Sequence, residues 1–258
     1  MIRIDINSDV GERPDALRDG SEEGLMRCIT SASIACGIHA GDESTMEAVI
    51  SIAKRCGVGV GAHPSFPDRE NFGRLEMNLR PEEIVSCVFD QVTRLAQLAE
   101  LQHVELRHVK PHGALYNLAV HDIRVAEAIA KGVRKHDKSL ILFGLAESKM
   151  LEVWLDLGMR VAREAFADRS YEADGSLRSR KFHDSLITDP DEAARRAVLI
   201  ARDGRVKAVD GMMLSLRADT ICIHGDTPNS TSIAGAVRRA LEEDGITVSP
   251  FLNPASTG

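Results

Sequence analysis

Apolar residues recur along the chain with two spacings that alternate from one end to the other. Short apolar runs, typical of buried strands, are separated by longer segments in which apolar residues return at helical spacing. The predicted strands cover residues 2–6, 33–36, 58–62, 105–109, 140–143, 159–163 and 220–223. Strands that alternate with helices in this way indicate βα units arranged on a parallel sheet.

The segments between these strands carry start and stop signals for helices. Asp42 precedes an amphipathic stretch that Gly57 ends, and Pro81 stands at the first turn of a longer one. Further helices are predicted at residues 122–135, 148–157, 190–203 and 230–243. About seven βα units in a chain of this length fit a closed barrel better than an open sheet. The sequence therefore predicts the α/β fold class, as a single (β/α)7 TIM-like barrel domain over residues 1–258.

Composition and charge narrow the classes of partner. The chain has 32 basic and 39 acidic residues and no basic run interleaved with aromatic residues, so we expect no nucleic-acid partner. No apolar run approaches the length of a membrane span, and the N-terminus lacks the apolar core of a signal peptide. We therefore expect no membrane partner and a cytoplasmic location. The five cysteines are scattered without a CxxC pair and are expected to be reduced thiols.

Unusual polar residues cluster at the carboxyl ends of the predicted strands. In chain order they are Asn7, Asp9, Glu12, His39, Asp42, His63, Lys110, His112, His224 and Asp226. Because the carboxyl ends of parallel barrel strands meet on one face, we expect these side chains to share a rim, where enzymes of this fold keep their active sites. Histidines, carboxylates and a lysine together favour proton transfer or metal-assisted hydrolysis.

Several of these residues also have structural interpretations that the sequence leaves open. His39 and Asp42 fit either the site or the start of the following helix, where Asp42 would be the N-cap. Arg169, in the long polar loop 165–188, is equally suited to bind a substrate carboxylate or to pair with a neighbouring acidic residue. Asp9, His39 and His63 together suit an open metal site, although the same groups also suit acid–base chemistry without a metal.

Seven ordered blocks of the sequence resemble the signatures of the LamB/YcsF family and run nearly its whole length. They are DINSDVGE at 5–12, SIACGIHAGD at 33–42, GVGVGAHPSFPD at 57–68, FGR at 72–74, RHVKPHGALYN at 107–117, FADRSYEADGSL at 166–177 and LRADTICIHGD at 216–226. The resemblance implies a seven-stranded barrel of the glycoside hydrolase/deacetylase type. It also implies the A component of an ATP-dependent 5-oxoprolinase, which opens 5-oxo-L-proline to L-glutamate with separate B and C subunits and is inactive without them.

The resemblance also implies cofactors and roles. ATP is expected at the level of the complex, with Mg²⁺, and the chain itself has neither a GxxxxGK[ST] nor a GxGxxG loop at a strand-to-helix junction. The expected catalytic residues are Asp9, His39, Asp42, His63, Lys110, His112 and Asp226. Among them, Lys110 would stabilise the oxyanion, and Asp42 and Asp226 would orient histidines. The expected substrate-binding residues are Asn7, Glu12, Arg74, Arg169 and His224.

Two other functions fit the same residues. The first is a metal-dependent deacetylase or amidohydrolase that acts on a small N-acyl or sugar substrate. Tightly bound metal in the purified protein would favour this function. The second is a lactam-binding subunit without catalysis of its own, for which the rim histidines would be dispensable. The sequence leaves open whether the chain also forms a homo-oligomer.

Overall fold

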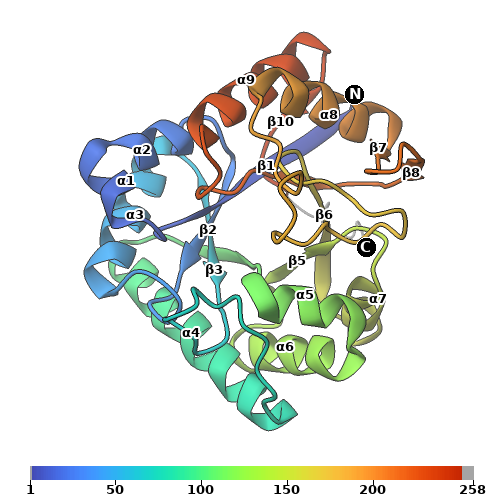
Figure 1. The fold of residues 1–258 in the computed structure, drawn as a ribbon. Coiled ribbons are helices and arrows are strands. Elements are labelled where there is room, and N and C mark those ends of the chain that lie inside the picture. Colours follow the sequence, from blue (N-terminus) through green and yellow to red (C-terminus); the bar gives the residue numbers. More distant parts are fainter. Residues whose placement is uncertain (1, 252–258) are drawn as a thin grey trace, which may run out of the picture.

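The computed structural model describes residues 2–251, which form a closed parallel barrel wrapped by helices (Figure 1). In barrel order the strands are β1 (Arg3–Val10), β2 (Ser31–Ala35), β3 (Gly59–His63), β4 (Leu106–Val109), β5 (Ile141–Leu145), β6 (Arg160–Phe166) and β9 (Thr220–Cys222). Strand β9 pairs in parallel with both β6 and β1, which closes the barrel. The predicted (β/α)7 barrel is confirmed, and every predicted strand overlaps a barrel strand.

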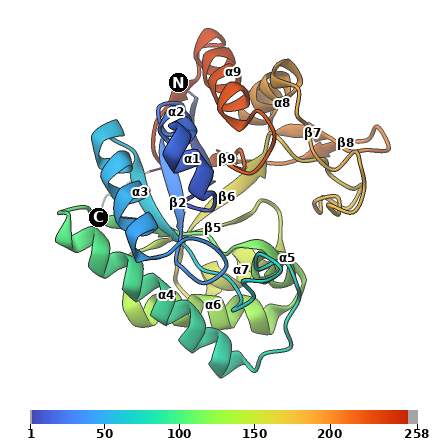
Figure 2. The same cartoon turned by 60° about the vertical axis from the view of Figure 1, so that its left-hand side comes forward.

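Helices cover the outside of the barrel. They are α1 (Pro14–Asp19), α2 (Ser21–Met26), α3 (Glu43–Cys56), α4 (Pro81–Leu101), α5 (Gly113–His121), α6 (Ile123–His136), α7 (Lys149–Asp156), α8 (Pro190–Asp203) and α9 (Ser230–Glu243). Helices α8 and α9 pack together on one side of the barrel, and α4 and α6 on the other (Figures 1 and 2). No helix within residues 2–251 is long and apolar enough to cross a membrane.

Some elements were not predicted from the sequence. Helices α1 and α2 have six residues each and follow one another without a connecting loop long enough to mark them. Helix α5 begins at Gly113, directly after the Lys110-Pro111-His112 segment. The hairpin of β7 (Arg205–Lys207) and β8 (Met213–Ser215), and β10 (Thr247–Val248), which pairs with β1, are too short to show a strand pattern.

Strands β1 and β6 extend past their predicted carboxyl ends, and the added residues include buried polar side chains. Strand β1 continues to Val10, so Asn7 and Asp9 lie within the strand rather than after it. Because successive side chains of a strand point to opposite faces, Asp5, Asn7 and Asp9 share the inner face of the barrel. Strand β6 likewise continues past its predicted end to include Glu164. The barrel interior therefore becomes polar toward the carboxyl ends of its strands.

Candidate active site

A cavity of about 580 Å³ opens at the carboxyl ends of the barrel strands. Its lining comes from segments far apart in the chain and combines acidic, basic and imidazole side chains. The members with the most direct chemistry are Asp9, Glu12, His63, Arg74, Lys110, His112, Arg169, His224 and Asp226. The expected convergence on one rim is therefore present for these residues.

Four buried side chains beside the cavity form a compact acid–imidazole cluster. Glu12 follows β1, His39 follows β2, His63 ends β3, and His112 precedes α5. The Glu12 Oε1 atom lies 3.0 Å from His39 Nε2, 3.1 Å from His112 Nδ1 and 3.6 Å from His63 Nε2. Potential ligand atoms of all four residues lie within 4.8 Å of one another, so the cluster could hold a divalent cation.

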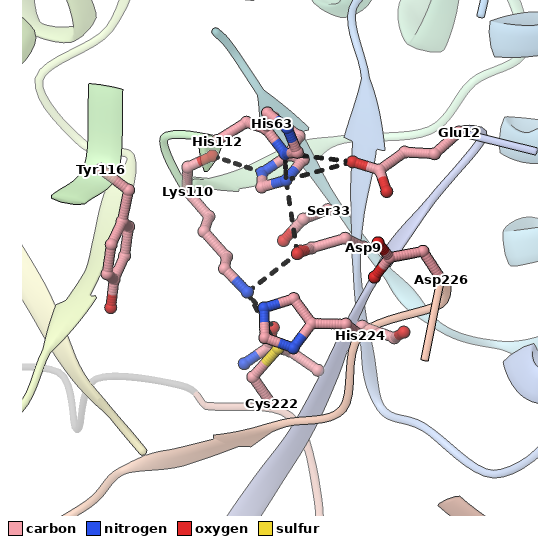
Figure 3. Close-up of polar contacts among 12 residues, drawn as sticks. Asp9, Glu12, Ser33, His63, Lys110, His112, Tyr116, Cys222, His224 and Asp226 are labelled. Carbon is pink, nitrogen blue, oxygen red and sulfur yellow. Dashed lines mark hydrogen bonds and ion pairs between the residues drawn. The ribbon is translucent and has the colours of Figure 1, made fainter. Parts of the chain in front are cut away.

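A buried ion pair lies next to this cluster. The Lys110 ammonium is 3.0 Å from Asp9 Oδ1 and 2.8 Å from Glu164 Oε1, and it also contacts Cys222 (Figure 3). Burial disfavours the charged lysine, but the negative charges of Asp9 and Glu164 outweigh burial and hold the pKa of Lys110 well above its usual range. Lys110 is therefore a fixed positive charge at the cavity.

His224 forms a second polar arrangement on the opposite side of Lys110. Its Nδ1 lies 3.0 Å from Asp168 Oδ2, and the Thr227 hydroxyl donates to the same carboxylate at 2.6 Å. Burial raises the pKa of Asp168, but the His224 charge and these hydrogen bonds outweigh it and lower that pKa to about 2. Because an ionised carboxylate only accepts, Nδ1 of His224 carries a proton, and in the neutral imidazole the lone pair is then on Nε2.

Arginines form the remaining wall of the cavity. The Arg169 guanidinium is buried and donates to the carbonyls of Ser185 and Arg178. Burial, with the nearby charge of Arg180, lowers the pKa of Arg169 to about 10. Within residues 2–251 no carboxylate is paired with Arg169, so its charge is available to a ligand. Asp226 instead pairs with Arg74 and, at 3.0 Å, with Arg180.

Comparison with known proteins shows the family of this chain. The model of the LamB/YcsF family matches residues 4–256. The A component of 5-oxoprolinase from Chloroflexus aggregans is 48% identical over 96% of this chain and 98% of its own length.

The chain belongs to the LamB/YcsF family.

Solved structures support the fold of this family member. The lactam utilization protein from Thermus thermophilus is 42% identical, covers 97% of this chain and 100% of its own, and has a TM-score of 0.89. A family 4 carbohydrate esterase from Streptomyces lividans, only 10% identical, covers 99% of this chain and 95% of its own with a TM-score of 0.51. The second likeness concerns the fold alone and agrees with the expected deacetylase-type barrel.

Three residues of the LamB/YcsF blocks do not have the contacts that we expected. Asp42 is exposed and caps α3 through the Thr45 amide at 2.8 Å, so it orients no histidine. Asp226 orients two arginines instead of a histidine, as its ion pairs show. Asn7 is fully buried and does not line the cavity, because Glu164 and Thr220 accept both protons of its amide. Its expected substrate contact stays a prediction that this position does not support.

Other functional candidates were missed in the sequence. Glu164 forms an ion pair with Lys110 and accepts a hydrogen bond from the Tyr116 hydroxyl at 2.8 Å. Asp168 orients His224. Arg180 shares Asp226 with Arg74. The only signal for Asp168 and Glu164 was their position in or beside the block at 166–177, because their partners lie in other blocks of the chain. Hydropathy gives no indication of such pairs.

Proposed function

We propose that this chain is the lactam-hydrolysing subunit of an ATP-dependent 5-oxoprolinase and acts in the cytoplasm. The observation that carries the proposal is the cavity in which an oriented imidazole, a fixed ammonium and an arginine without a carboxylate partner lie together. The substrate, 5-oxo-L-proline, has a carboxylate for the arginine and an amide carbonyl for the other two groups. The name of the Chloroflexus aggregans relative supports the same substrate.

The reaction requires water to add to the lactam carbonyl and the ring C–N bond to break. His224 is the best-placed base, because its Nε2 is free to accept the proton of water while Asp168 holds Nδ1. That proton then passes to the ring nitrogen as it leaves as an amine. Asp9 is a weaker candidate base, because His63 and Lys110 outweigh its burial and hold its pKa well below its usual range.

Lys110 acts through its charge rather than through a spare N–H group. Its ammonium carries three protons, and four acceptors already surround it: Asp9, Glu164, Asn7 and Cys222. The positive charge still lowers the energy of an oxyanion that develops in the water-poor cavity. Asp9 and Glu164 thus position the charge that the reaction needs.

Arg169 binds the carboxylate of the substrate. Its Nη2 donates to the Arg178 carbonyl and its Nε to the Ser185 carbonyl. These two hydrogen bonds fix the guanidinium and leave Nη1 for a ligand. A buried, fixed guanidinium is preorganised for a carboxylate, which strengthens the contact relative to an exposed arginine.

ATP enters at the level of the complex, with Mg²⁺ on the nucleotide and separate B and C subunits as partners. A lactam is a poor electrophile because amide resonance is lost when water adds, so ATP-driven activation by the partners would prepare it for hydrolysis here. The absence of a phosphate-binding glycine loop from the sequence agrees with this division of labour.

The test is the ATP- and Mg²⁺-dependent formation of glutamate by this chain alone, by the B and C subunits alone, and by all three. We expect glutamate only from the complete mixture. His224→Gln in that mixture should lower kcat by about 100-fold or more, the usual contribution of a general base, while His121→Gln, a change at an exposed cavity residue, should have little effect. Undiminished turnover with His224→Gln would support a lactam-binding subunit without catalysis of its own.

A metal-dependent deacetylase or amidohydrolase is the second candidate, favoured by the buried Glu12 and histidine cluster. If folded wild-type protein forms no glutamate in the complete mixture, release of acetate from small N-acetyl compounds with added Zn²⁺ would replace the first proposal by this one.

A further inference from the structure

The acid–imidazole cluster contains a contact that neutral side chains do not make. His63 Nδ1 lies 2.7 Å from the Lys110 carbonyl, and His112 Nε2 lies 2.9 Å from the Phe72 carbonyl. A carbonyl oxygen only accepts, so these two nitrogens carry the protons of their rings. The other two nitrogens, His63 Nε2 and His112 Nδ1, then face each other as lone pairs at 2.9 Å.

A carboxylate oxygen adds to this concentration of negative charge. Glu12 Oε1 lies 3.1 Å from His112 Nδ1 and 3.6 Å from His63 Nε2. Three electron-rich atoms in mutual contact at the wall of the cavity repel one another, and a cation among them removes this repulsion. That cation is either an additional proton on one ring or a metal ion.

The distances are compatible with a metal ion, and the kinds of ligand favour one. Zinc binds histidine nitrogen at about 2.0–2.1 Å, so neighbouring ligand atoms of a tetrahedral site are roughly 3.3 Å apart. The three observed separations of 2.9, 3.1 and 3.6 Å lie on both sides of this value. Two imidazoles with one carboxylate suit zinc and similar transition metals better than Mg²⁺ or Ca²⁺, which prefer oxygen ligands. The carbonyls behind both rings are the outer partners typical of metal-binding histidines.

His39 differs from the other two histidines. A metal ion lies in the plane of each imidazole that binds it, and the rings of His39 and His112 are stacked at 3.9 Å and 7°, so they cannot share one ion. The rings of His63 and His112 meet at 83°, which permits joint binding. His39 also does not line the cavity, whereas Glu12, His63 and His112 do. His39 Nε2 instead lies 3.0 Å from Glu12, as a donor that orients the carboxylate.

We infer that Glu12, His63 and His112 bind one divalent transition-metal ion of the zinc class, with an open coordination position toward the cavity and with His39 as a positioning residue for Glu12. This set replaces two of the three ligands expected from the sequence, Asp9 and His39. Asp9 Oδ2 lies 3.4 Å from His63 Nε2, but Asp9 is not among the four residues whose ligand atoms lie within 4.8 Å of one another, and its Oδ1 is paired with Lys110.

The role of the ion in turnover rests on the proposed function, whereas its binding does not. An ion at this position is next to Lys110 and faces the same cavity, where it would supply a Lewis acid for the substrate carbonyl. That contribution matters because the protons of Lys110 are already taken by protein acceptors.

The experiment measures metal binding by the full-length chain without partners. Protein stripped with a chelator is titrated with Zn²⁺ in a calorimeter and with Co²⁺ by visible absorption, and circular dichroism confirms that each variant is folded. We expect one ion per wild-type chain and a Co²⁺ spectrum of a four- or five-coordinate site. Glu12→Gln, His63→Gln and His112→Gln should each weaken binding by more than about 100-fold, since outer partners alone contribute about 10- to 100-fold.

Two further variants separate this ligand set from the alternatives. His39→Gln should weaken binding only about 10- to 100-fold and keep one ion per chain, and Asp9→Asn should keep the ion with the same stoichiometry. A loss with His39→Gln or Asp9→Asn as large as with His63→Gln would overturn the assignment. Folded wild-type protein that binds neither Zn²⁺ nor Co²⁺ would show that the cation is a proton and overturn the site itself. Metal binding without glutamate formation by the complete mixture would keep the site and remove the proposed function.

Discussion

At the scale of single residues, the carboxylates of the LamB/YcsF blocks are distinguished by their partners. Asp9 holds the Lys110 ammonium, Asp168 holds an imidazole, and Asp226 holds two guanidinium groups. Asp42 belongs to the same blocks but accepts hydrogen bonds from Ser44 and Thr45 at the start of α3. The sequence located Asp9, Asp42 and Asp226 near one face, but it missed Asp168 and could not assign the partners, because each partner is brought in by the fold.

Asp42→Ala should therefore change stability and not chemistry. Loss of an N-cap costs about 1 kcal/mol, so we expect a lower Tm for the variant and unchanged metal affinity and glutamate formation at a temperature where it is folded. Asp189→Ala is the matched control, because Asp189 caps α8 through the Glu192 amide at the same distance of 2.8 Å. A loss of turnover with Asp42→Ala that Asp189→Ala does not share would return Asp42 to the site.

At the scale of elements, hydropathy predicted the apolar part of each barrel strand but not its polar end. Strand β1 was predicted to stop before Asn7 and β6 before Glu164, because a buried polar pair has the same hydropathy as an exposed one. The two side chains satisfy each other across the barrel at 2.9 Å. The sequence therefore predicts the number of barrel strands, whereas the extent of β1 and β6 depends on pairing across the interior.

Strand β3 offers a test of how tightly the barrel interior is filled. A Cβ atom at Gly61 would lie 2.2 Å from the ring of His108, which is buried and stacks on Phe143 at 4.2 Å. A Cβ atom at Gly59, on the same strand, meets nothing closer than 3.5 Å. Overpacking of a filled core costs about 1–3 kcal/mol or more.

We expect Gly61→Ala to lower the free energy of unfolding in urea by about 3 kcal/mol, and Gly59→Ala to change it by less than about 1 kcal/mol. Equal stabilities of the two variants would mean that the His108 ring moves aside without cost. Because neither glycine lines the cavity, metal affinity should be retained in whichever variant is folded.

At the scale of the whole molecule, several buried ionisable groups are held in ion pairs, whereas the buried Glu22 is not. Lys110 lies between two carboxylates, and Asp168 is held by His224. Within residues 2–251 no cation is paired with the buried Glu22, whose carboxyl group accepts a hydrogen bond from the Gly11 amide. Burial, with the charge of Glu12, raises the pKa of Glu22 from 4.5 to about 7.

This raised pKa links the global stability of the barrel to pH. The folded state favours the neutral carboxyl group, so its contribution is fully present below pH 4.5 and is lost as the pH rises through about 7. Glu22→Gln keeps an acceptor for Gly11 and removes the titration. Between pH 5 and 8 the free energy of unfolding of the wild type should therefore fall relative to that of Glu22→Gln, by up to about 3 kcal/mol.

Urea unfolding at several pH values measures this difference, and Glu23→Gln is the control on the same helix. Glu23 is more exposed and pairs with Arg27 and Arg55, which lower its pKa, so its replacement should leave the pH profile between 5 and 8 parallel to that of the wild type. A Glu22→Gln profile that is also parallel to the wild type would mean that Glu22 is ionised in the folded protein throughout this range. In that case the buried carboxylate must be stabilised by more than the Gly11 amide.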